Sequence, residues 1–130
     1  MTSIARPAKS TVAVVDDSPL ALEMTRRALE NGGFAVVTAS NIAELEAAIA
    51  RSAPDLLLVD VNMPEMYGDH VAMVLKQVRR FEVPIWLFSN ELEADLATRV
   101  KDAEADGFIS KNDGMEAVVA RVQAILRRDS

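Results

Sequence analysis

Short apolar runs alternate with longer amphipathic segments along most of the chain. The runs are bounded by turn-forming residues and are rich in Val, Ile and Leu, which is typical of strands buried on both faces of a sheet. The strands predicted in this way are Thr11–Val15, Phe34–Thr38, Leu56–Val59, Ile85–Phe88 and Gly107–Ile109.

The segment after the first strand has clear helix signals at both ends. Ser18 followed by Pro19 predicts an N-cap and a first helical position, and Asn31-Gly32-Gly33 predicts the end of the helix. The periodicity predicts that this helix turns one face towards the core, made of Ala21, Met24 and Ala28.

Four further helices follow from the same spacing of apolar residues. Asn41 is predicted to cap the second helix, which ends before Pro54, and Asp113 or Asn112 to cap the last one. The third helix is predicted over Gly68 to Arg80. The inward-facing residues expected on the four helices are Ile42, Leu45 and Ile49; Val71, Val74, Leu75 and Val78; Leu92, Leu96 and Val100; and Met115, Val118, Val119 and Val122.

Five strand–helix units in a row predict a parallel sheet with right-handed crossovers and helices on both faces. The expected fold is therefore a doubly wound α/β domain with five strands. We expect residues 1–10 to be a flexible lead-in and residues 11–128 to form one domain, since 130 residues suit a single core.

Composition narrows the class of function. The net charge of −6 and a pI near 4.8 argue against a nucleic-acid-binding surface, which needs clustered basic residues. The absence of cysteine excludes disulfides and thiol chemistry. No apolar run approaches the length of a membrane span, and the N-terminus lacks the apolar core of a secretory signal. A cytoplasmic location is expected.

Polar residues follow the predicted strands at the end where parallel sheets bind ligands. Only Thr38, Ala39 and Ser40, without charge, lie at the end of the second strand. The other four strands are followed by Asp16 and Asp17, by Asp60, by Ser89 and Asn90, and by Lys111. Each of these residues alone could be a turn or cap residue, but together they predict one polar pocket.

Three clustered carboxylates repel one another unless a cation joins them, and oxygen ligands of this kind suit Mg²⁺. A metal ion, a lysine and a hydroxyl around a carboxylate make a site suited to phosphoryl transfer. Asp60 could then act as a nucleophile and form an aspartyl phosphate, while Asp16 and Asp17 hold the metal.

The motifs VAVVDDS, LLLVDVNMP, WLFSN and GFISK, in this order, resemble the receiver domain of two-component response regulators. The chain is also similar to single-domain chemotaxis-type receivers. The resemblance covers nearly the whole sequence and implies the flavodoxin-like strand order 2-1-3-4-5. It implies a phosphorylation-dependent switch with output by protein binding, and no conventional enzyme activity.

The resemblance also assigns the phosphorylation site. It implies that Asp60 accepts the phosphoryl group from a histidine kinase or a phosphotransfer protein. Asp17 and Asp60 would bind Mg²⁺ directly, Asn62 would bind it through its backbone carbonyl, and Asp16 would act through a water molecule. Lys111 would pair with the phosphate.

Further residues would control switching and the lifetime of the phosphate. Ser89 has the position of the switch hydroxyl and Phe108 that of the switch aromatic residue, with a target protein on the face of the fourth helix, fifth strand and last helix. Asn62 and Glu91 would flank the path of the hydrolytic water, while bulky Asn90 narrows it. Because amide and carboxylate groups can orient that water, we expect a short-lived signal.

Two residues depart from the pattern of the family. Asn112 follows Lys111, where the family usually has proline after a cis peptide bond, so a trans or a strained bond is expected. Asn90 follows Ser89, where a small residue is usual. Both departures bear on the ease of switching and leave the phosphate acceptor in place.

The sequence is also compatible with other functions. The main alternative is a receiver-like adaptor that binds partners without phosphorylation. A flavin or nucleotide binder on the same fold is disfavoured because Asp16-Asp17 would repel a phosphate. An aspartate-dependent phosphohydrolase would need a cap insertion, for which the short connections leave little room. The sequence is compatible with a stand-alone protein or with an excised domain.

Overall fold

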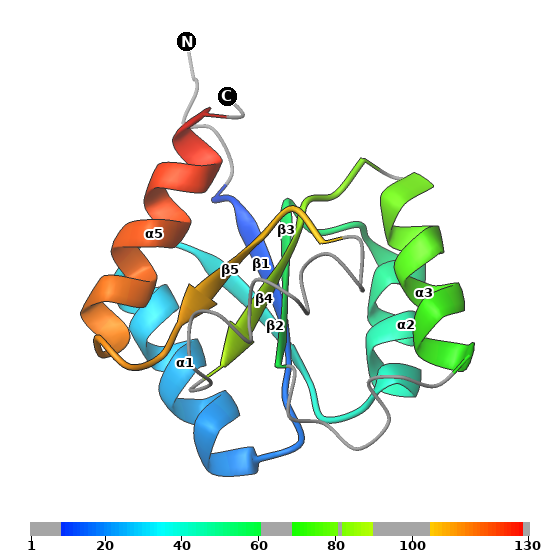
Figure 1. Ribbon diagram of the computed structural model, residues 1–130, viewed down its shortest axis with the longest axis horizontal. Coiled ribbons are helices and arrows are strands. Elements are labelled where there is room, and N and C mark those ends of the chain that lie inside the picture. The colour runs from blue at the N-terminus through cyan, green and yellow to red at the C-terminus, as the bar shows by residue number, and fades with distance from the viewer. Residues whose placement is uncertain (1–8, 61–68, 81, 90–104, 129–130) are drawn as a thin grey trace, which may run out of the picture.

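The structure is a computed structural model that describes residues 9–60, 69–80, 82–89 and 105–128. In this part of the chain, five parallel strands form one sheet with the order β2-β1-β3-β4-β5, which confirms the expected fold (Figure 1). In chain order the elements are β1 Thr11–Val15, α1 Pro19–Asn31, β2 Ala35–Ala39, α2 Ile42–Arg51, β3 Leu56–Asp60, α3 Asp69–Arg80, β4 Ile85–Ser89, β5 Gly107–Ser110 and α5 Met115–Arg128. The expected helix with Leu92, Leu96 and Val100 lies outside the described residues.

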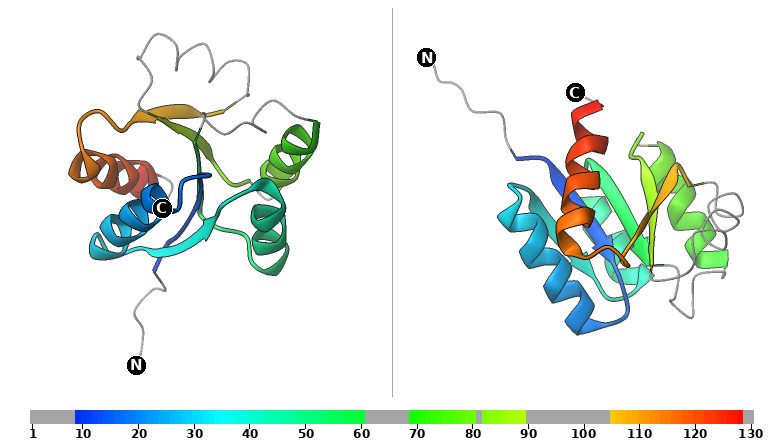
Figure 2. Two further views of the ribbon diagram at one scale, coloured as in Figure 1. Left: turned by 90° about the horizontal axis from the view of Figure 1, so that it is seen from below. Right: turned by 60° about the vertical axis from the view of Figure 1, so that its left-hand side comes forward.

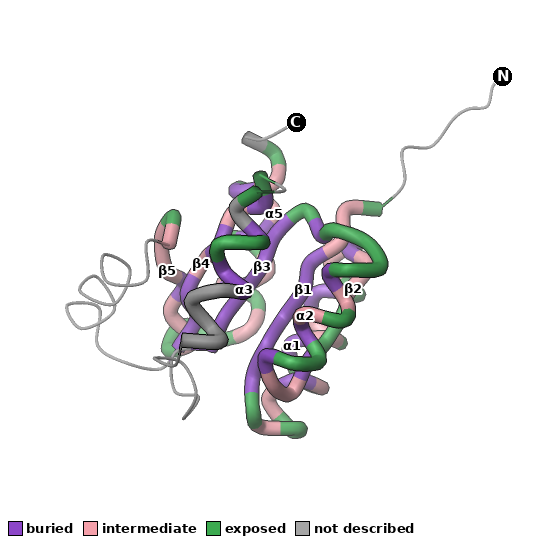
Figure 3. The backbone as a smooth tube through the Cα atoms, turned by 90° about the vertical axis from the view of Figure 1, so that its right-hand side faces the viewer, coloured by how far each residue is buried: buried purple, intermediate pink, exposed green. Residues whose placement is uncertain are grey.

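The sheet is covered on both faces. Helices α1 and α5 pack on one face, and α2 and α3 pack on the other (Figure 2). Successive residues of a strand point to opposite faces, so the odd-numbered residues of β3 join the α2/α3 core and the even-numbered ones join the α1/α5 core. Figure 3 shows that the central strands β1, β3 and β4 are buried, whereas the outer faces of the helices are exposed.

Two of the predicted N-caps are confirmed. The Ser18 hydroxyl accepts a hydrogen bond from the Ala21 N–H at 3.2 Å, with Pro19 at the first helical position. The Asn41 side chain accepts the Glu44 N–H at 2.9 Å. In return, Glu44 accepts hydrogen bonds from the backbone N–H and the hydroxyl of Ser40, which lower the pKa of Glu44. These caps fix where α1 and α2 begin.

The prediction for the cap of α5 was wrong. Helix α5 begins at Met115, so the residue directly before it is Gly114, whose carbonyl accepts the Val118 N–H at 3.2 Å. Gly114 has a φ of 89°, a conformation that glycine adopts without strain. The chain therefore turns at a glycine between Lys111 and α5.

The predicted inner face of α1 was also wrong. The buried residues are Leu22, Thr25 and Leu29, while Met24 is 53% exposed. Two leucines bury far more apolar area than two alanines, so they set the rotation of the helix about its axis. The second strand is shifted by one residue from its predicted bounds, because Phe34 packs into the α1/α5 core ahead of β2.

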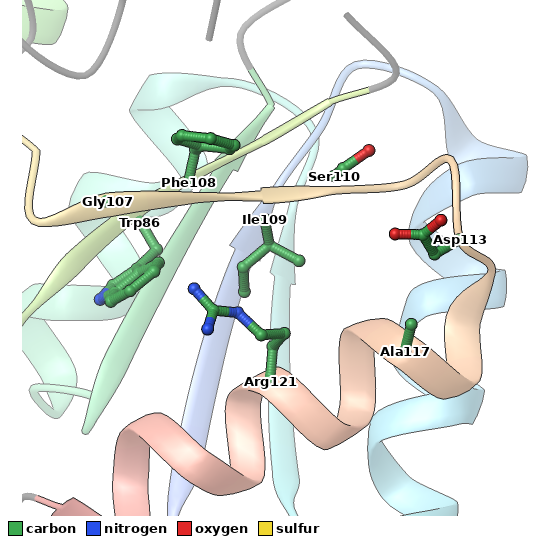
Figure 4. Close-up of a pocket in the computed structure, with 8 residues that line it drawn as sticks. All are labelled: Trp86, Gly107, Phe108, Ile109, Ser110, Asp113, Ala117 and Arg121. Carbon is green, nitrogen blue, oxygen red and sulfur yellow. The ribbon is translucent and has the colours of Figure 1, made fainter. Parts of the chain in front are cut away.

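Gly107 makes a close contact between neighbouring strands. It is the register partner of Trp86, and a Cβ atom at this position would lie 2.6 to 2.9 Å from three carbons of the indole ring. The ring lies between β5 and α5, with the Arg121 guanidinium 5.3 Å from its centroid (Figure 4). A side chain at position 107 therefore has no space unless the ring moves.

We expect Gly107→Ala to lower the free energy of unfolding by about 1–2 kcal/mol, because the cost of overpacking exceeds the gain from a stiffer unfolded chain. Urea unfolding measures the change. The matched background is Trp86→Leu, in which the same Gly107→Ala substitution should cost much less. Equal costs in both backgrounds would show that the ring is not the cause.

Candidate functional site

Three carboxylates meet at the carboxyl ends of β1 and β3. One oxygen from each of Asp16, Asp17 and Asp60 lies within 4.8 Å of the others. Asp16 and Asp60 are only 1% and 4% exposed, whereas Asp17 is exposed to solvent. Asp16 is held by the backbone, since its Oδ1 accepts the Ser18 N–H at 3.0 Å. The predicted acidic pocket is therefore present.

Lys111 brings a positive charge to the same pocket. Its Nζ lies 3.1 Å from Asp16 Oδ2 and 4.0 Å from Asp60 Oδ2, and its side chain is 14% exposed. The Lys111 N–H donates to the Ser89 carbonyl at 2.9 Å, which ties the end of β5 to the end of β4. Among the described residues, one ammonium meets three carboxylates here, so their charges sum to a local excess of negative charge. The pocket therefore attracts a further cation.

The register of the sheet explains why these groups meet. Val15 pairs with Val59, and Asp60 pairs with Phe88 on β4. By alternation, Asp16, Asp60 and Phe88 form a row across three strands and turn to the α1/α5 side of the sheet. The Phe88 ring completes the surroundings of Lys111, whose Nζ lies 4.3 Å from the ring centroid.

Phe88 was not singled out from the sequence as a site residue. The sequence feature that could have identified Phe88 is its position directly before Ser89, at the end of the strand that neighbours the strand of Asp60. Its register with Asp60 becomes clear only when β3 and β4 are paired.

Ser89 and Phe108 lie on the opposite, α2/α3 side of the sheet. Leu87 pairs with Phe108 and Ser89 pairs with Ser110, so all four residues share one face by alternation. Ser89 is fully buried, and Phe108 is partly buried against the α2/α3 core. The two residues that the sequence named as a switch thus lie on one face, one strand apart.

A second concave surface lies between β5 and α5. It has a volume of about 420 Å³. In Figure 4, the side chains of Trp86, Ile109 and Arg121 lie between β5 and α5, whereas that of Phe108 lies on the opposite side of β5. The lining residues are Trp86, Gly107, Phe108, Ile109, Ser110, Asp113, Ala117 and Arg121. This pocket belongs to the face on which the sequence predicts a partner.

Asn62, Asn90 and Glu91, expected to affect the metal site or the lifetime of the phosphate, lie outside the described residues. Asn112 is exposed, and its N–H donates to the Ser110 hydroxyl at 3.1 Å. The described residues contain no cis peptide bond, so the bond between Lys111 and Asn112 is trans, as expected without proline.

The donor set fits Mg²⁺. All three acidic side chains offer oxygen, and two of them lie at the buried end of the pocket while Asp17 lies at its open side. Hard oxygen donors with access to solvent suit an ion that retains part of its water shell.

Among the described helices, none is long and apolar enough to cross a lipid bilayer.

The sequence matches the family model of the response regulator receiver domain over residues 12–123. Among curated proteins, the transcriptional regulatory protein PrrA of Mycobacterium tuberculosis is 34% identical over 117 residues, which cover 90% of this chain and 50% of PrrA. The transcriptional regulatory protein KdpE of the same species is 32% identical, with 92% and 52% coverage. The chain spans about half the length of the curated relatives it matches.

Solved structures give the same result. The chemotaxis protein CheY4 of Vibrio cholerae has a TM-score of 0.77 and 29% identity, covering 90% of this chain and 98% of its own. The signal receiver domain of the response regulator NarL from Mycobacterium tuberculosis has a TM-score of 0.75 and 32% identity, with 93% and 98% coverage. The family match, which spans most of the chain, and the shared fold together show that this chain belongs to the response regulator receiver domain family.

Proposed function

We propose that this receiver domain is a phosphorylation-dependent switch in which Asp60 accepts a phosphoryl group from a histidine kinase or a phosphotransfer protein. The observation that carries the proposal is the position of Asp60 at the end of β3, among two other carboxylates and beside the Lys111 ammonium. Receiver domains are signalling domains and not conventional enzymes. We place the domain at residues 11–128 and in the cytoplasm.

The chemistry needs mainly positioning and charge compensation. A carboxylate oxygen of Asp60 attacks the phosphorus of a phosphohistidine, and the P–O bond forms as the P–N bond breaks. Lys111 compensates negative charge next to Asp60. Asp17, Asp60 and the backbone carbonyl of Asn62 would hold Mg²⁺, with Asp16 acting through water. The ion would neutralise the charge of the carboxylates and of the phosphoryl oxygens.

The signal would leave the site through Ser89 and Phe108. Ser89 would turn to donate a hydrogen bond to the phosphoryl group, and Phe108 would move into the space that the hydroxyl leaves. Their shared face of the sheet supports this coupling. A target protein would bind the face made by β5, α5 and the segment between β4 and β5.

The lifetime of the phosphate would depend on Asn62, Asn90 and Glu91. We propose a short-lived signal, because an amide and a carboxylate beside the phosphate can orient an attacking water. This part of the proposal rests on the resemblance of the sequence alone.

The first test is phosphorylation by acetyl phosphate with Mg²⁺, followed by intact-mass spectrometry. We expect the wild type and the matched control Asp55→Asn to gain the mass of one phosphoryl group, and Asp60→Asn to gain none. Asp55 is an exposed carboxylate at the other end of the same strand. If Asp60→Asn gains the same mass, the acceptor is misassigned. A wild type that stays unmodified would favour the adaptor function.

The second test concerns the cation. We expect Mg²⁺ to raise the melting temperature of the wild type, because it relieves the repulsion among three carboxylates. In EDTA, Asp17→Asn should be more stable than the wild type by on the order of 1 kcal/mol, a modest value because Asp17 is exposed. It should also lose most of the increase caused by Mg²⁺. The exposed residue Asp113 provides the control Asp113→Asn. A full Mg²⁺ response in Asp17→Asn would contradict the site.

The third test follows the switch. We expect beryllofluoride, a phosphoryl mimic, to shift the NMR signals of the Phe108 ring and of β5 in addition to those around Asp60. In Ser89→Ala, the signals around Asp60 should still respond, while the response of Phe108 should shrink. A response of Phe108 that is equally large in both proteins would remove Ser89 from the pathway.

A further inference from the structure

The Lys111 ammonium lies over the face of an aromatic ring. Its Nζ is 4.3 Å from the centroid of Phe88, within the range over which a cation is attracted to the negative face of a ring. The Phe88 ring is fully buried and the Lys111 side chain is 14% exposed. The contact is therefore largely shielded from water, which makes the attraction stronger than on an open surface.

The same ammonium has two acidic neighbours, and both belong to the proposed cation site. Asp16 lies 3.1 Å from it and Asp60 lies 4.0 Å from it. A divalent cation bound by these carboxylates would compete with Lys111 for their negative charge. The Phe88 ring is no ligand for Mg²⁺, which prefers oxygen, so its attraction for the ammonium persists when the cation binds.

We propose that Phe88 is a positioning residue for phosphoryl transfer, whose ring keeps the Lys111 ammonium next to Asp60 when a divalent cation takes over the carboxylates. This inference rests on the proposed function. The register supplies the geometry, because Phe88 is the direct partner of Asp60 on the neighbouring strand. Phe88 acts on the reaction only through Lys111.

The competing explanation is that Phe88 only fills the α1/α5 core. Phe34 provides a matched control, since it is a buried phenylalanine of the same cluster but lies at the other end of the sheet, directly before β2, whereas Lys111 follows β5. Phe88→Leu and Phe34→Leu each remove one ring from that core and keep an apolar side chain. A role in packing alone predicts similar effects for both variants.

The first readout is the NMR signal of the Lys111 ε-methylene protons, recorded without and with Mg²⁺ and without phosphorylation. A ring face shields protons above it, so we expect an upfield shift in the wild type and in Phe34→Leu that persists when Mg²⁺ is added. In Phe88→Leu this upfield shift should be lost. An unchanged signal in Phe88→Leu would overturn the proposal, whatever the fate of the proposed function.

The second readout is the second-order rate constant of phosphorylation by acetyl phosphate with Mg²⁺. We expect Phe88→Leu to lower it about fivefold to thirtyfold, which corresponds to a cation–π contact of about 1–2 kcal/mol, and Phe34→Leu to leave it within about twofold. Site-specific 3,4,5-trifluorophenylalanine at position 88 keeps the shape of the ring and weakens its negative face, so it should also lower the rate. A normal rate with this residue, or an equal loss in Phe34→Leu, would show that the ring acts by packing only.

Discussion

The parallel register of β1, β3 and β4 is the constraint on which the site depends. It aligns the ends of three buried strands, so that Asp16, Asp60 and Phe88 turn to the same side of the sheet. A slip of one residue between β3 and β4 would turn every side chain of one strand to the opposite face. The apolar runs prevent such a slip, because both faces of the sheet are buried.

The pocket combines two opposing requirements. Burying Asp16 and Asp60 at the end of the sheet costs free energy, which the ion pair with Lys111 offsets in part. Asp17 adds a third carboxylate to the same cluster. The acidic cluster can therefore bind a cation. A charged group added to the pocket changes the balance of charge around Lys111, so the pocket also responds to that group.

The sequence predicted those features that depend on local patterns. Apolar runs located all five strands, and the residues after them located Asp16, Asp17, Asp60 and Lys111. Features that depend on long-range packing could not be predicted in this way. The predicted rotation of α1 was wrong because Leu22 and Leu29 compete with Met24 for the core. The predicted start of α5 was wrong because the residue directly before the helix is Gly114, which has no side chain to signal a cap in the sequence. The contact of Phe88 with Lys111 required the pairing of β3, β4 and β5.

The contact between Trp86 and β5 has an optical consequence. Trp86 is the only tryptophan in the sequence, and its indole ring lies against Gly107 and under the Arg121 guanidinium. The tryptophan fluorescence of the protein therefore originates from one ring, whose emission depends on a nearby cation and on the exposure of the ring to water. Any rearrangement between β5 and α5 changes both of these conditions. The protein thus carries an intrinsic fluorophore at the face where a partner is expected to bind.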